Sequence, residues 1–94
     1  MSRYSLQDAV AEALSVISEV ERIAAEAERH AATCRATSQA EREALAETPP
    51  DARPSALARI DRLCVEAMTL SRIAADLRAA LADRSGTVIA PARR

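Results

Sequence analysis

The side chains best suited to chemistry are the only histidine, His30, and the two cysteines, Cys34 and Cys64. Imidazole and thiolate groups are ligands that Zn²⁺ and Cu(I) accept. A spacing of four residues would place His30 and Cys34 on the same side of a helix. A Cys34–Cys64 disulfide is a second possibility, for which the two Cα atoms must approach within about 7 Å. A thiol near an imidazole is also the minimum set for nucleophilic catalysis.

The helix pattern around these residues argues against a shared metal site, and nothing in the sequence indicates the oxidising compartment that a disulfide needs. Cys34 falls on the expected line of contact between two helices, with His30 on one flank of that line and Cys64 on the other. The three would converge only if the helices rotated or another subunit contributed. The sequence also offers no third orienting group and no Gly-rich loop. We therefore predict no enzyme activity, no cofactor and no metal, and retain His30, Cys34 and Cys64 as an alternative metal- or thiol-based sensor site.

The first half of the chain predicts one long helix, from about residue 5 to residue 47. Ser5 suits the N-cap, and Asp8 stands where the acid of a capping box belongs. Apolar or small residues then recur at alternating spacings of four and three, which is the pattern of a helix that packs along one line. This first seam consists of Leu6, Val10, Ala13, Ile17, Val20, Ala24, Ala27, Ala31, Cys34, Ser38, Glu41 and Leu45.

Three prolines in the segment 48–54 end this helix and predict a turn. A second helix is predicted from about residue 53 to residue 84. Ser85 and Gly86 favour a stop there, which leaves residues 85–94 as a flexible tail. The second seam consists of Ala56, Ile60, Leu63, Ala67, Leu70, Ala74, Leu77 and Leu81.

Two long helices joined by a short turn predict an all-α antiparallel hairpin, with residues 1–94 forming a single domain. If facing residues have numbers that add up to about 101, many layers match a small side chain with a large one. Ala supplies 23 of the 94 residues, Phe and Trp are absent, and Tyr4 is the only aromatic residue. The core of one hairpin is therefore expected to be poor in large side chains.

The same register predicts that the first helix extends beyond the second by about four turns. The overhang is the most apolar part of the chain, and the second helix has apolar residues away from its seam. Exposed apolar surface of this length predicts a partner, and a homodimeric four-helix bundle is the simplest assembly. The predicted interface residues are Leu6, Val10, Leu14, Ile17, Val20, Ile23, Met68 and Ile73.

Charge is divided unevenly between the two halves of the chain, although the net charge is −1. Residues 1–50 carry five Arg and nine acidic residues, whereas residues 51–94 carry eight Arg and five acidic residues. Opposite charges on the two helices favour their pairing. A weaker alternative is nucleic-acid binding, which lacks stacking aromatics and would use the arginines of the second helix. These are Arg59, Arg62, Arg72, Arg78 and Arg84.

Together these features predict a non-enzymatic protein–protein interaction module, such as a small regulator, chaperone or inhibitor. The absence of Lys beside abundant Arg and Ala suggests a bacterial source with a GC-rich genome. Neither a secretory signal nor a membrane-spanning segment is visible in the sequence, so we expect a cytoplasmic protein whose partner is another protein. No motif identifies a family.

Overall fold

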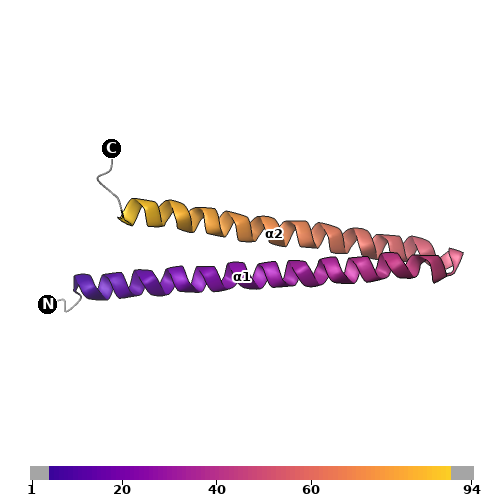
Figure 1. Ribbon diagram of the computed structural model, residues 1–94, viewed down its shortest axis with the longest axis horizontal. Coiled ribbons are helices and arrows are strands. Elements are labelled where there is room, and N and C mark those ends of the chain that lie inside the picture. Colours follow the sequence, from indigo (N-terminus) through magenta and orange to yellow (C-terminus); the bar gives the residue numbers. More distant parts are fainter. Residues whose placement is uncertain (1–4, 90–94) are drawn as a thin grey trace.

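The computed structural model describes residues 5–89, with side chains described as far as Asp83. Two helices, α1 (Leu6–Ala44) and α2 (Arg53–Ile89), lie antiparallel to each other (Figure 1). The described residues contain no strand. The predicted all-α hairpin is thus confirmed. Within this part of the chain, neither helix has an apolar stretch long enough to cross a membrane.

The start of α1 is held by a reciprocal capping box. The Ser5 hydroxyl accepts a hydrogen bond from the Asp8 N–H at 3.1 Å, and the Asp8 carboxylate accepts one from the Ser5 N–H at 3.2 Å. These bonds satisfy backbone donors that have no partner within the helix. The predicted N-cap at Ser5 is therefore confirmed.

The connection between the helices consists of two 3₁₀ helices, η1 (Leu45–Glu47) and η2 (Pro50–Ala52). Between them Thr48 has an extended backbone, the conformation favoured before a proline. Two hydrogen bonds hold this residue in place. Its hydroxyl donates to the Ala44 carbonyl at 2.9 Å, and its own carbonyl accepts from Arg53 Nε at 3.1 Å. The proline segment therefore forms a tight turn that sends α2 back along α1.

The end of α2 differs from the sequence-based expectation. The helix continues through Ser85 and Gly86 to Ile89, instead of ending near Arg84. One glycine inside a helix costs about 1 kcal/mol relative to Ala, which is too little to end a long helix by itself. The segment 85–89 is therefore helical, and residues 90–94 of the predicted tail lie outside the described residues. The five added residues of α2 shorten the overhang of α1, which still reaches beyond the end of α2 (Figure 1).

Where the two seams meet, most of the buried residues are small. Ala31, Cys34 and Ala67 form the buried cluster at the centre of this contact, and Leu63 and Leu70 pack against it. All eight seam residues of α2 are buried or half-buried. On α1, seam burial begins only at Ile17, because the helices diverge toward their free ends (Figure 1). No large side chain is fully buried among the described residues, so the closest packing is made by Ala.

Candidate functional site

One flank of the hairpin is closed by polar contacts that repeat every seven residues. We call it the polar flank, and its cross-helix hydrogen-bonded pairs are Glu28 with Arg78, Arg35 with Ser71, and Arg42 with Cys64. A seven-residue repeat returns to the same side of each helix after two turns, and the pairs run in opposite directions along α1 and α2. The three contacts thus report one antiparallel register along the middle of the hairpin.

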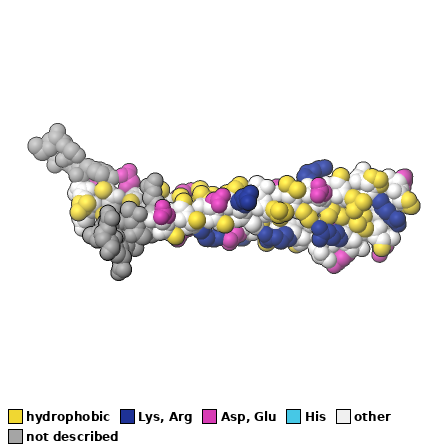
Figure 2. Space-filling view, turned by 90° about the horizontal axis from the view of Figure 1, so that it is seen from above, with side chains coloured by type: hydrophobic (Ala, Val, Ile, Leu, Met, Phe, Trp, Pro, Cys, Tyr) yellow, Lys and Arg dark blue, Asp and Glu magenta, His cyan; other side chains and the backbone are white. Residues whose placement is uncertain are grey.

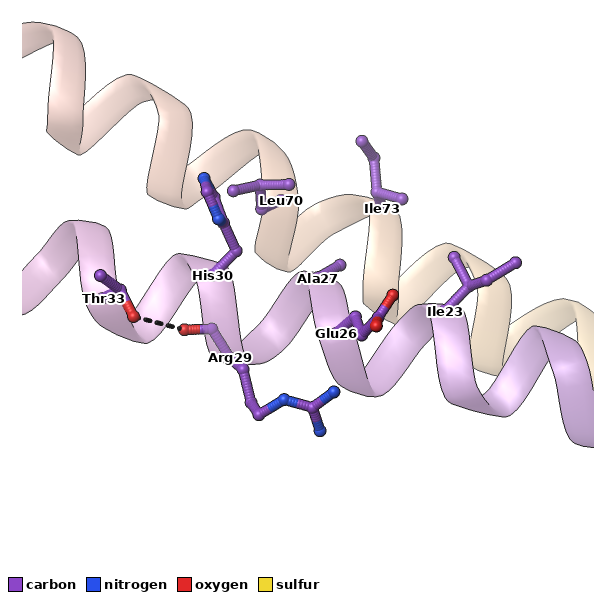
Figure 3. Close-up of a pocket in the computed structure, with 8 residues that line it drawn as sticks. All are labelled: Ile23, Glu26, Ala27, Arg29, His30, Thr33, Leu70 and Ile73. Carbon is purple, nitrogen blue, oxygen red and sulfur yellow. Dashed lines mark hydrogen bonds between the residues drawn. The ribbon is translucent and has the colours of Figure 1, made fainter.

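The opposite flank is apolar over part of its length. Ile23 of α1 and Ile73 of α2 are 42% and 44% exposed and border a shallow groove, with Leu70 and His30 beside them (Figure 3). Val16, seven residues before Ile23, is also exposed. We call this side, formed by Val16, Ile23 and Ile73, the apolar flank. A cross-helix pair on this side, between His30 and Glu66, lies nearer the connection between the helices.

A polar cluster lies on this side of the hairpin, two turns nearer the connection between the helices than Ile23 and Ile73. The ring nitrogen Nε2 of His30 lies 3.3 Å from Oε2 of Glu66 on α2. A ligand atom of His30, the sulfur of Cys34 and a carboxylate oxygen of Glu66 all lie within 4.8 Å of one another. The structure therefore brings together two of the three predicted candidates, and the third group that joins them is Glu66 rather than Cys64.

The Cys34 thiol is buried against α2, 4% exposed. Burial raises the pKa of this thiol, and the nearby negative charge of Glu66 raises the pKa further. A thiolate is the nucleophilic and redox-active form of cysteine. A thiol held protonated in this way is poorly suited to nucleophilic catalysis.

Cys64 has a different environment. Its sulfur lies 3.3 Å from the Ser38 hydroxyl and accepts a hydrogen bond from Arg42 at 3.1 Å. These contacts place Cys64 on the polar flank, away from the side that carries His30. Both cysteines are free thiols in the structure, so the disulfide considered from the sequence is not formed.

The predicted interface residues fall into two groups. Ile17 and Val20 are half-buried in the seam. The other six are exposed, with values from 42% at Ile23 to 81% at Leu6. These six are Leu6, Val10, Leu14, Ile23, Met68 and Ile73. The structure therefore leaves most of the predicted surface uncovered, both near the free ends and along the hairpin.

The arginines considered for nucleic-acid binding are partly engaged within the hairpin. Arg59 Nε lies 2.8 Å from Oε1 of Glu41, and Arg78 pairs with Glu28. Basic and acidic side chains alternate over the face seen in Figure 2. Such a face presents no continuous positive surface to a phosphate backbone. Arg84 lies beyond the described side chains.

Sequence reasoning overlooked Glu66 because only cysteine and histidine were considered as ligands. Glu66 precedes the seam residue Ala67, which faces Cys34 in a register where facing residues add up to 101. A search of both flanks for carboxylates at that level would have found it. Comparison with protein-family models, with curated proteins and with solved structures finds no match to this chain.

Proposed function

We propose that this protein is a non-enzymatic interaction module that works as a homo-oligomer, most simply a dimer joined through the apolar flank. The observation that supports the proposal is the difference between the side chains on the two flanks of the hairpin. Polar pairs recur along one side, whereas on the other side Ile23 and Ile73 stand exposed next to a single level that the His30–Glu66 pair occupies. Exposed apolar side chains from two helices at the same level are typical of a surface that another helix covers.

The total exposed surface supports the same proposal. The chain exposes 7409 Å², whereas a compact monomer of its 10.1 kDa mass would expose about 5,300 Å². A standard interface buries about 800 Å² on each partner. Loss of that much surface would still leave each chain more exposed than a compact monomer. The hairpin thus has ample surface for a dimer interface.

A second copy of the chain is the occupant that the geometry favours. A twofold axis would bring the apolar flank of one hairpin against the same flank of the other, as in the isologous interfaces of most homodimers. The result is a four-helix bundle in which Ile23 and Ile73 of both chains fill a common core. Large apolar side chains would then complement the alanines that line each single hairpin.

Such a bundle would act through its remaining surface on another protein, as a small regulator, chaperone or inhibitor does. Leu6, Val10 and Leu14 remain exposed near the free end of α1. They provide an apolar surface next to the dimer core that a further helix could cover. The sequence features that suggest a bacterial and cytoplasmic protein are compatible with this role.

Substitutions on the apolar flank test the proposal. Ile23→Asp and Ile73→Asp should each weaken self-association, measured by analytical ultracentrifugation, by at least about a hundredfold. Removal of one buried Ile costs about 1.5–3 kcal/mol, and a twofold interface contains each residue twice. Both variants should keep their helical circular dichroism, because these side chains are already exposed in the single hairpin.

The matched control is Leu57→Asp, which introduces the same charge at a side chain that is 53% exposed near the turn. It should leave self-association nearly unchanged. If all three variants weakened self-association equally, or if none did, the apolar flank would not be the interface.

A further inference from the structure

We propose that His30, Cys34 and Glu66 form a binding site for a divalent transition-metal ion of the Zn²⁺ class that joins α1 to α2. Imidazole nitrogen, thiolate sulfur and carboxylate oxygen are the three ligand types that protein zinc sites use, and the Cys34 thiol would release its proton to solvent as the ion binds. The site is complete within one chain, so it does not depend on self-association.

The distances between the ligand atoms suit a tetrahedral ion. In such a site, zinc–nitrogen and zinc–oxygen bonds of about 2.0–2.1 Å place the two ligand atoms about 3.3 Å apart. His30 Nε2 and Glu66 Oε2 already lie 3.3 Å apart. The Cys34 sulfur lies within 4.8 Å of both groups, so small side-chain rotations would bring the sulfur to bonding distance of the same ion.

The helices hold these ligands by a simple geometry. His30 and Cys34 are one turn apart on α1, the spacing by which one helix commonly presents two ligands to a single metal. Glu66 reaches them from α2, next to the seam residue Ala67. Three protein ligands leave a fourth coordination position, and it would open to solvent because the side chains of His30 and Glu66 are 59% and 48% exposed.

A metal bound here would tie the two helices together beside the central alanine cluster. It would also neutralise the charge of Glu66 next to the groove that Ile23 and Ile73 border (Figure 3). Metal binding at this site should therefore stabilise the hairpin, since a ligand that binds only the folded state raises its stability.

Titration of the full chain with Co²⁺, followed by displacement with Zn²⁺, tests the site. The reduced wild-type protein should bind one Co²⁺ per chain and show a thiolate-to-cobalt absorption band. Cys34→Ser should abolish that band. Glu66→Gln and His30→Gln should each weaken Zn²⁺ binding at least tenfold, because even changes beyond the direct ligands commonly cost 10–100-fold.

The matched controls are Cys64→Ser, which removes the other thiol, and Glu21→Gln, which removes an exposed carboxylate of α1. Both should bind Co²⁺ and Zn²⁺ as the wild type does. The proposal would be overturned by the absence of the absorption band in the wild type, by its loss in Cys64→Ser, or by unchanged Zn²⁺ affinity in Glu66→Gln. Glu66 is exposed, so this last variant should fold normally and its result can be read directly.

Discussion

At Cys34, two features of the surroundings shift the pKa of the thiol in the same direction. Burial against α2 disfavours the thiolate, and so does the negative charge of Glu66; together they raise the pKa of the thiol. The folded chain therefore holds this proton more tightly than the unfolded chain does. Below the unfolded pKa of about 8.5 both states are protonated, and the stabilisation is fully present.

This difference predicts how stability depends on pH at the alkaline end. As pH rises above about 8.5, the unfolded chain loses the Cys34 proton first, so the free energy of unfolding should fall. Urea unfolding of metal-free protein at a series of alkaline pH values measures the effect. Cys34→Ala should reduce the slope, and an equal slope in both proteins would show that Cys34 does not titrate differently on folding.

The same residue shows what sequence could and could not predict about the candidate site. The seam placed Cys34 in the helix contact and His30 beside it, and the structure confirms both positions. The exclusion of Cys64 from their cluster also follows from its flank. The Arg42 and Ser38 contacts of Cys64 depend on side-chain reach across the hairpin, which heptad spacing does not specify.

At the scale of the helices, the closeness of α1 and α2 depends on alanine. Ala24, Ala31 and Ala74 are completely buried, and small side chains allow two helices to approach with few voids. Where the α1 seam changes to Ile17 and Val20, the side chains are larger and only half-buried. The helices diverge in that direction (Figure 1).

Two substitutions on α1 test this dependence on small side chains. Ala31→Leu should lower the free energy of unfolding by about 1–3 kcal/mol, because extra methylene groups in a packed contact force the helices apart. Ala36→Leu makes the same change at an exposed position and should have little effect. Chemical unfolding followed by circular dichroism compares the two, and equal stability would contradict close packing at Ala31.

The start of α1 and the end of α2 differ in how well the sequence predicts them. The start of α1 was predictable because the Ser5–Asp8 capping box is local, and it forms as expected. The end of α2 was not, because Ser85 and Gly86 only weaken a helix. A glycine ends a helix when it adopts a left-handed conformation, and no glycine in the described residues does so.

At the scale of the whole molecule, the single hairpin is long and thin. Its radius of gyration is 21.1 Å, whereas a compact domain of this length would have one of about 12 Å. The sequence predicted this shape through two long seams and few large core residues. The polar or apolar character of each flank could not be predicted as directly, because it depends on which residues meet across the hairpin.

A concentration series of the wild-type protein by sedimentation equilibrium measures whether the hairpin self-associates. We expect an assembly with at least twice the 10.1 kDa mass of one chain, most simply a dimer, that dissociates only on strong dilution. A folded monomer throughout the micromolar range, with full helical circular dichroism, would contradict it.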